Sequence, residues 1–321
     1  MDFAQYVTAT PLTSHTYAVT LDESWCIGSV PNGGYVTSTL ISAVNTHFAT
    51  TLARLDQPDT MSMQLQFLRR THAGPGVVTV VDLKLGSGIS VVQATFSQDG
   101  RDEVQGYVTH MNFARESGLS VRPEPHCGLL PAPLPIDFSA VEAHGRDANW
   151  RTARDSRVAT SFRKGMQHLV FTKPNTPQDK GFADQWVRFR PGGPSQDTVP
   201  FVQEAIGYVV DMFPLAFRES RHMTEEEKKA PRWYPTVSLN LDVKRRIAPD
   251  TRWLFVRATT AEVHNGRFDI EIVVLDQEGR LVALSNHVSL ILGSERNLAE
   301  RKHKAKDTDG SGKKTIASGK L

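Results

Sequence analysis

The sequence has few cysteines, no long apolar run and little net charge, and each absence excludes a class of protein. The chain of 321 residues contains two cysteines, Cys26 and Cys127, too few for a disulfide framework and suited to a reducing compartment. No apolar run reaches the length of a membrane span, and the first residues lack the basic-then-apolar pattern of a signal peptide. We therefore expect a cytoplasmic protein without a membrane span.

The formal net charge of +2 is unevenly distributed along the chain. Residues 293–321 contain eight Lys/Arg and four Asp/Glu, so the preceding residues together carry about −2. That part of the chain lacks a nucleic-acid footprint, and no nucleic-acid partner is expected. The tail at 294–321 is charged and poor in large apolar residues, which predicts disorder. It ends in Gly-Lys-Leu, which only approaches the peroxisomal signal Ser-Lys-Leu.

Motifs for metals, nucleotides and redox cofactors are also absent. No Cys/His cluster has the spacing of a zinc site, no Gly-rich phosphate loop follows a strand, and no dinucleotide fingerprint occurs. We expect neither a metal nor a cofactor. The hydrophobic content of 39% is nevertheless that of a globular protein with a sizeable core.

Hydrophobic periodicity places one strand, one helix and four strands in the first part of the chain. The strand is expected at Thr16–Leu21, and the helix runs from the Asn32-Gly-Gly turn to about Arg54. The four following strands are expected at 60–69, 77–85, 89–97 and 102–112, with Gly-containing turns between them.

The same order recurs after a proline-rich stretch at 119–180, in which a short helix within 140–149 is expected. A strand is predicted at 183–190, a helix at 198–220, and strands at 236–244, 253–263, 267–275 and 281–292. Asp211 lies inside the apolar run of that helix, between Val210 and Met212. A lone carboxylate there is either solvated on the other helix face or retained at a cost for a function.

The two units also share residues in register. Gln66-Phe-Leu-Arg-Arg corresponds to Asp242-Val-Lys-Arg-Arg, and Arg101 and Arg280 each follow a turn about thirty residues later. This pattern indicates a duplication. A helix followed by an antiparallel four-strand meander packs well when the sheet curls around the helix, which predicts an α+β double hotdog fold. The expected domains are an N-terminal hotdog at 1–118, the connector at 119–180 and a C-terminal hotdog at 181–293.

Several stretches resemble the type II, double-hotdog class of acyl-CoA thioesterases, in particular its fungal thioesterase-like branch. The resemblance covers residues 15–293 apart from much of the connector. The matching stretches are Pro31-Asn-Gly-Gly-Tyr, Gln66-Phe-Leu-Arg, Gly88-Ile-Ser, Gln185-Trp-Val-Arg, Gly207-Tyr-Val-Val-Asp-Met-Phe-Pro, Trp253-Leu and Gly279-Arg-Leu-Val-Ala-Leu-Ser.

The resemblance implies a hydrolytic water held by a helix Asp, a strand Thr or Ser, and a Gln of the final strand. By position, these are Asp211, Ser238 and His287, with Thr236 not excluded because the turn that follows this position differs by about one residue. His287 departs from the family's Gln, and an imidazole, unlike an amide, can accept the proton of a water near neutral pH. Alternatively, Asp211 is solvated, Ser238 is an ordinary strand residue and His287 is a satisfied core histidine. A nucleophilic Ser238–His287–Asp211 triad is disfavoured because no Gly-x-Ser-x-Gly elbow surrounds Ser238.

Candidate substrate-binding residues lie at the start of the first helix and at two basic strand ends. Adjacent glycines allow a thioester to approach backbone amides closely, although they are equally compatible with a tight turn. Basic pairs can bind the phosphates of coenzyme A, although they are more often solvated. These candidates are Asn32, Gly33, Gly34, Tyr35, Arg69 and Arg246.

The expected activity is hydrolysis of acyl-CoA or of an acyl group on a carrier protein. Two alternatives remain: a non-catalytic hotdog that binds an acyl or polyketide-like ligand, and an enoyl-thioester hydratase or dehydratase. The latter is disfavoured because neither helix start carries the Asp and His pair of those enzymes. Paired hotdogs satisfy each other's sheet edges, so a monomer is compatible with the fold, as is a homo-oligomer.

Overall fold

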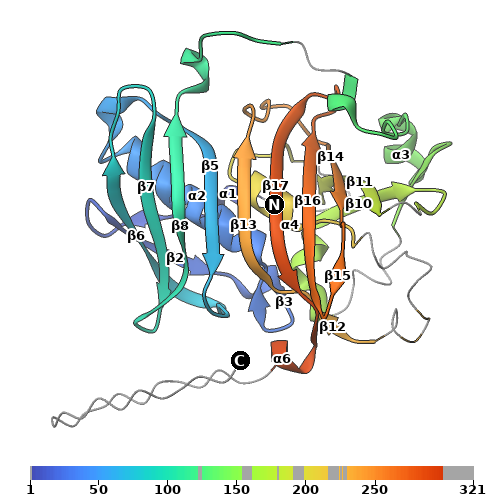
Figure 1. Cartoon of the computed structure of the whole chain (residues 1–321), viewed down its shortest axis with the longest axis horizontal. Coiled ribbons are helices and arrows are strands. Elements are labelled where there is room, and N and C mark those ends of the chain that lie inside the picture. Colours follow the sequence, from blue (N-terminus) through green and yellow to red (C-terminus); the bar gives the residue numbers. More distant parts are fainter. Residues whose placement is uncertain are drawn as a thin grey trace.

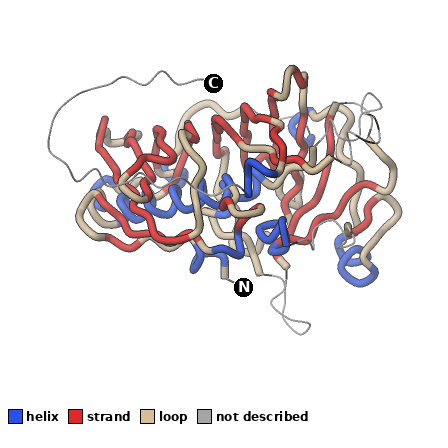
Figure 2. The backbone as a smooth tube through the Cα atoms, turned by 90° about the horizontal axis from the view of Figure 1, so that it is seen from below, coloured by secondary structure: helices blue, strands red, loops and turns tan. Residues whose placement is uncertain are grey.

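The computed structural model describes residues 2–121, 125–153, 161–178, 181–190, 199–215, 224, 226 and 230–298. Within them, fourteen strands form one long sheet, curved around two helices (Figures 1 and 2), and two short strand pairs, β3-β4 and β12-β18, lie outside it. This architecture confirms the α+β double hotdog predicted from the sequence.

The first half of the sheet surrounds a helix of 17 residues, α2 (Gly33–Ala49). Its strands follow the predicted order, and their spatial order is β2-β6-β7-β8-β5. Alternating burial along β7 shows that one face packs on the helix while the other is more accessible. The strands are β2 (Thr16–Leu21), β5 (Asp59–Phe67), β6 (Gly74–Lys84), β7 (Ser90–Gln98) and β8 (Arg101–Met111).

The second half repeats this arrangement around a much shorter helix, α4 (Ala205–Asp211). Its spatial order is β13-β17-β16-β14-β11-β10-β9. The predicted strands are found as β11 (Phe182–Phe189), β13 (Thr236–Val243), β14 (Leu254–Thr259), β16 (Arg267–Leu275) and β17 (Leu281–Leu290).

The two halves join where β5 pairs antiparallel with β13, with Leu65 opposite Leu239. Behind the sheet, α2 and α4 cross at two glycines. A Cβ atom on Gly34 would lie 2.6 Å from the carbonyl oxygen of Gly207, and one on Gly207 would lie 2.8 Å from the backbone nitrogen of Ser38. The glycines therefore bring the start of α2 against the end of α4.

The second helix is a correction to the sequence prediction, which placed one helix at 198–220. Of that stretch, residues 199–204 and 212–215 are not helical, and 198 and 216–220 lie outside the described residues. Pro214 accounts for the end, because its ring fixes φ, lacks an N–H and disfavours the helical conformation of Phe213. As a result, Asp211 is the last residue of the helix. The first helix also ends early, at Ala49 instead of near Arg54.

The connector contains more regular structure than its sequence suggests. The short helix expected within 140–149 is found as α3 (Phe138–His144), and two strands extend the sheet beyond β11. These strands, β9 (Trp150–Thr152) and β10 (Leu169–Pro174), were not predicted. β10 is buried at five of its six residues, which is the pattern of an interior strand.

Short elements complete the described chain. The tail predicted to be disordered lies outside the described residues from 299 onward. No helix in the described part of the chain has the length and apolar character needed to cross a lipid bilayer. The short elements are α1 (Phe3–Tyr6), β1 (Thr10–Pro11), β3 (Cys26–Ile27), β4 (Val30–Pro31), β12 (Arg232–Trp233), β15 (Val263–His264), β18 (Leu292–Gly293) and α6 (Glu295–Leu298).

Candidate active site

The carboxylate of Asp211 lies where the end of α4 meets the start of α2. Its Oδ2 atom accepts hydrogen bonds from the side-chain amide of Asn32, at 2.7 Å, and from the backbone N–H of Gly34, at 2.8 Å. Its Oδ1 atom accepts a longer bond of 3.3 Å from the hydroxyl of Thr236. Asp211 thus belongs to the second half of the chain but is held mainly by donors from the first half.

The local sequence explains why these donors meet the carboxylate. Asn32 caps α2 by accepting a hydrogen bond from the backbone N–H of Tyr35, which leaves its side-chain N–H groups free to point at Asp211. The glycines provide the space: a Cβ on Gly33 would lie 3.2 Å from Oδ2 of Asp211, and one on Gly34 would lie 2.6 Å from its Cβ. The Asn-Gly-Gly motif therefore provides both the hydrogen-bond donors and the space for the carboxylate of Asp211.

Burial raises the pKa of Asp211 from 3.8 to about 6, and the hydrogen bonds from Gly34, Asn32 and Thr236 partly oppose that rise. Only 8% of its side chain is exposed. A carboxylate with a pKa near 6 is largely ionised at neutral pH yet basic enough to accept a proton. These are the properties of a general base.

The structure brings Thr236, and not Ser238, to Asp211. On a regular strand the two side chains would lie on the same face, but β13 has a register shift between these residues where it pairs with β17. Ser238 instead lines a small depression together with Gln64, Gln66 and Asn240, whereas Leu239 beside it is buried in the core. The sequence placed both hydroxyls by strict alternation, which a bulge interrupts.

His287 lies on β17 directly behind the carboxylate, with Nδ1 3.8 Å from Oδ1 of Asp211. The hydroxyl of Ser285 donates to the carbonyl oxygen of Asn240, at 2.6 Å, so its oxygen accepts from Nε2–H of His287, at 2.9 Å. This assigns the tautomer: Nδ1 carries the lone pair, and it has no hydrogen-bond partner among the described residues.

Burial also lowers the pKa of His287, to about 3. The side chain is fully buried and does not contribute to the cavity wall beside Asp211. An imidazole with so low a pKa is neutral at pH 7 but is a weak base. Of the two groups, Asp211 therefore has the higher pKa, and the neutral imidazole of His287 can accept a hydrogen bond at Nδ1.

A cavity of about 1590 Å³ opens onto Asp211. Asn32, Gly33 and Thr236 line it together with the carboxylate. Apolar side chains form another part of its wall, including Phe67, Met166, Leu169, Phe171, Met212 and Phe213. The volume exceeds what a small metabolite needs and suits an extended, partly apolar ligand.

Basic side chains outnumber acidic ones around this cavity. The acidic lining residues besides Asp211 are Glu142, which accepts a hydrogen bond from Trp253, and Asp184, which forms a buried bidentate ion pair with Arg257. Arg257 therefore neutralises the charge of Asp184, and Glu142 accepts a hydrogen bond from an indole. The basic lining residues include Arg69, Arg70, Arg163, Arg188, Arg190 and Arg232, so the cavity favours anionic groups.

The other predicted binding residues are divided between this site and structural roles. Gly33 and Arg69 line the cavity, whereas Tyr35 is fully buried and its hydroxyl donates to the carbonyl oxygen of Tyr6. Arg246 does not line the cavity; it forms a bidentate ion pair with Asp59 at 2.6 and 2.8 Å. Arg246 therefore helps to tie the second half of the chain to the first.

Sequence reasoning did not single out several cavity residues. Gln185 is buried on β11 and donates from its side chain to the carbonyl oxygen of Met212, just after the carboxylate. Arg188 and Arg190 follow along the same segment. The alternation in the stretch Ala183–Arg190 was visible in the sequence, but nothing in that pattern indicated that this strand lies next to the segment that follows Asp211.

Comparisons with known proteins agree with the double hotdog fold. Models of the acyl-CoA thioesterase N-terminal and C-terminal domains match residues 21–111 and 136–291. The chain is 32% identical to the thioesterase-like protein TwmA of Talaromyces wortmannii, over 95% of this chain and 96% of that protein.

Two solved structures share the fold. A hot dog fold protein of unknown function from Alicyclobacillus acidocaldarius gives a TM-score of 0.69 at 16% identity, covering 91% of this chain and 98% of that one. An acyl-CoA thioesterase II from Mycobacterium marinum gives a TM-score of 0.59 at 18% identity, also covering 91% and 98%. At sequence identities this low, the two structures support the fold and not a shared function.

Proposed function

The chain belongs to the acyl-CoA thioesterase family, a thioesterase-like hydrolase with a double hotdog fold, and from this membership we propose how it acts. Asp211 is the general base that activates a water, and the substrate is an acyl thioester whose carrier bears phosphate. The observation that carries this proposal is a buried carboxylate with a pKa of about 6 at the wall of a large, basic cavity.

In the proposed reaction, the water oxygen attacks the thioester carbonyl carbon while one water proton passes to Oδ1 of Asp211. The tetrahedral intermediate then collapses, the C–S bond breaks, and the proton held by Asp211 reaches the departing sulfur. The products are a carboxylic acid and a free thiol. A positioned base contributes about 10²–10⁴-fold to the rate of such a step.

His287 and Thr236 position the water in this proposal. Oδ1 of Asp211 and Nδ1 of His287 are two neighbouring acceptors, and a water molecule has two hydrogens to donate. Because His287 does not itself line the cavity, such a water enters past Asp211 into the space between the two acceptors. A water that donates to both directs an oxygen lone pair away from them. Thr236 donates to the same Oδ1 atom and so limits the rotation of the carboxylate.

The start of α2 supplies a donor for the oxyanion. Three N–H groups of its first turn are engaged: Gly34 donates to Asp211, Tyr35 to the side chain of Asn32, and Val36 to the backbone carbonyl of Asn32. The backbone N–H of Gly33 has no such bond within the described part of the chain, and Gly33 lines the cavity. A free N–H at the positive end of a helix is suited to stabilise developing negative charge.

The basic cavity wall supports a phosphate-bearing carrier, either coenzyme A or the phosphopantetheine arm of an acyl carrier protein. Both present phosphate next to a long, flexible thiol arm, and arginine pairs well with phosphate. The apolar part of the wall accommodates the acyl chain.

Release of free thiol from a panel of acyl-CoA thioesters tests the proposal, with wild type compared with Asp211→Asn. Asparagine keeps the size of the side chain and can still accept hydrogen bonds from Asn32 and Gly34. The expected result is a fall in kcat of about 10²–10⁴-fold in a protein that remains folded. Equal turnover by the two proteins would sink the assignment of Asp211 as the base.

A further inference from the structure

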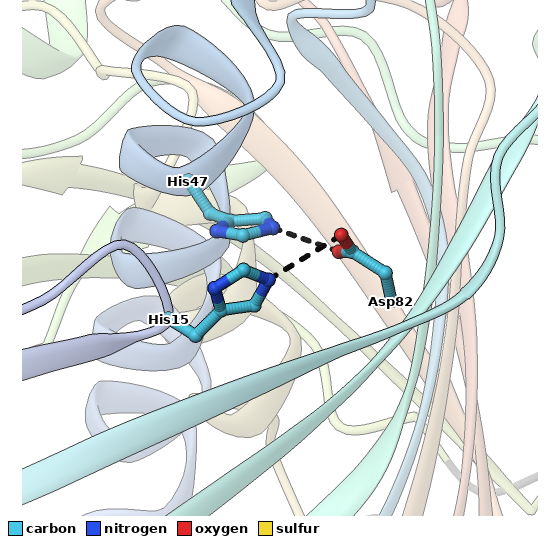
Figure 3. A group of neighbouring side chains, drawn as sticks. All are labelled: His15, His47 and Asp82. Carbon is cyan, nitrogen blue, oxygen red and sulfur yellow. Dashed lines mark hydrogen bonds and ion pairs between the residues drawn. The ribbon is translucent and has the colours of Figure 1, made fainter.

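Two histidines and an aspartate from three separate elements meet at the outer part of the first hotdog (Figure 3). His15 directly precedes β2, His47 lies in the last turn of α2, and Asp82 lies on β6. None of the three lines the cavity beside Asp211. The hydrolytic site described above gives this cluster no role.

The potential ligand atoms converge on one point. Nε2 of His47 lies 2.9 Å from Oδ1 of Asp82, and Nε2 of His15 lies 3.4 Å from Oδ2 of the same carboxylate. All three ligand atoms lie within 4.8 Å of one another. Both imidazoles therefore present the same nitrogen to one carboxylate, as Figure 3 shows.

The other nitrogen of each ring, Nδ1, is within hydrogen-bonding distance of other groups of the protein. Nδ1 of His47 contacts the hydroxyl of Tyr17 at 2.8 Å and the carbonyl oxygen of Ser14 at 3.1 Å, and Nδ1 of His15 contacts the hydroxyl of Ser14 at 2.8 Å. Tyr17 itself donates to the carbonyl of Ser14 at 3.0 Å, so its oxygen can accept from Nδ1–H of His47. That arrangement leaves the lone pair of His47 on Nε2. Outer partners of this kind orient most metal-binding histidines.

We propose that His15, His47 and Asp82 form a Zn²⁺ site. Zinc binds imidazole nitrogen at about 2.0–2.1 Å and carboxylate oxygen at about 2.0–2.2 Å, so neighbouring ligands of a tetrahedral ion lie roughly 3.3 Å apart. The distances of 2.9 and 3.4 Å bracket that value, but they end on different carboxylate oxygens and the ligand atoms spread over up to 4.8 Å. Zinc binding therefore requires the partly exposed His15 and Asp82 side chains to move closer together. An ion there takes the place of the direct contact between Nε2 of His47 and the carboxylate of Asp82.

Exposure allows the ion to enter and leaves a fourth position for water. The His47 side chain is fully buried, whereas 43% of His15 and 25% of Asp82 are exposed. The bound ion links the start of β2, the end of α2 and the end of β6, three segments of the first half of the chain. The ligands are separated by 32 and 35 residues in the sequence, so no short spacing signals the site.

Titration of metal-free, untagged protein with zinc chloride in a calorimeter tests the proposal. Wild type is expected to bind one zinc ion that His15→Gln and Asp82→Asn lose, with the dissociation constant raised at least about 100-fold. Zinc is also expected to raise the melting temperature of wild type more than that of either variant. Neither substitution changes the buried His47, so both variants keep the core intact.

His72→Gln is the matched control. His72 faces Asp99 at 3.8 Å as a partly exposed pair, but no third ligand group joins it among the described residues, so this variant is expected to bind zinc as wild type does. Wild type that takes up no zinc at this site would overturn the proposal. So would His15→Gln and Asp82→Asn with the stoichiometry and affinity of wild type, because the cluster would then be a hydrogen-bonded His–Asp group only.

Discussion

Nδ1 of His287 and Oδ1 of Asp211 lie 3.8 Å apart, and both atoms are hydrogen-bond acceptors. The tautomer of His287 is fixed by Ser285, so the histidine cannot donate to the carboxylate. A water molecule placed between these two acceptors could donate one hydrogen bond to each of them. A histidine with a purely structural role would not require a carboxylate beside its unprotonated nitrogen.

The pH dependence of hydrolysis distinguishes the two residues. The base form of Asp211 is present above its pKa of about 6, so kcat/KM is expected to fall about tenfold per pH unit below that value. His287, with a pKa of about 3, does not titrate in this range. His287→Gln is therefore expected to keep the acidic limb near pH 6. If His287→Gln instead lost the acidic limb of the pH profile, His287 and not Asp211 would be the base.

Thr236 and Ser238 are expected to differ, although they are only two residues apart. Thr236→Val removes the hydroxyl that donates to Asp211 while preserving shape, and kcat is expected to fall about tenfold, the equivalent of one hydrogen bond of roughly 1.5 kcal/mol. Ser238→Ala changes a side chain on the far face of β13 and should leave turnover unaffected. A loss of activity confined to Ser238→Ala would contradict the bulged geometry of the strand.

Asp211→Asn is expected to change the dependence of stability on pH. The pKa of Asp211 in the folded protein is raised above 3.8, so ionisation costs folding free energy as the pH rises from about 4 to 6. Relative to wild type, the variant should therefore gain melting temperature over this interval and keep a constant advantage above it. Thermal unfolding at pH 4, 5, 6 and 7.5 measures the difference. A difference that does not change with pH would show that the carboxylate is not perturbed.

Gly34→Ala tests the contact between the helices. The added Cβ would lie 2.6 Å from the backbone oxygen of Gly207 and 2.6 Å from Cβ of Asp211, so we expect a loss of about 1–3 kcal/mol in the free energy of unfolding. Activity should fall as well, because the clash displaces the carboxylate. Gly88→Ala is the control, since nothing lies within 4 Å of a Cβ at that position. Denaturant unfolding of both variants provides the comparison.

Removal of basic charge from the cavity should weaken binding of acyl-CoA in particular. Arg232→Gln is expected to raise KM for acyl-CoA several-fold with little change in kcat, and to leave KM for a short acyl thioester without phosphate unchanged. Arg267→Gln removes an exposed charge that does not line the cavity and serves as the control. Equal effects of Arg232→Gln on both substrates would argue against phosphate recognition by this wall.

The sequence was sufficient to predict the fold because its strong signals are local. These signals are the periodicity of the strands, the glycine turns and the similarity between Gln66–Arg70 and Asp242–Arg246. Each depends only on residues close together in the sequence, and together they predicted the two units. The extent of α4 was wrong because apolar spacing continues past Asp211 while Pro214 ends the helix. β10 was missed because buried strands lack the alternation that identifies exposed ones.

The site was harder to predict because it depends on features that do not appear in a sequence. Asp211 was singled out from its unusual surroundings in an apolar run. Choosing between Thr236 and Ser238 required knowledge of a bulge, and the protonation of His287 depended on a hydroxyl two residues away that points to another strand. The clustering of His15, His47 and Asp82 similarly depends on how three distant segments pack.

The hydrogen bonds from Asn32 and Gly34 to Asp211 have a consequence for how the protein can be altered or divided. They connect donors of one hotdog to the acceptor of the other, so a small rotation of either half lengthens both bonds at once. The pKa of a single carboxylate thereby reports on the alignment of two domains. Any ligand, partner or substitution that shifts this alignment would change the pKa of Asp211 without contacting it.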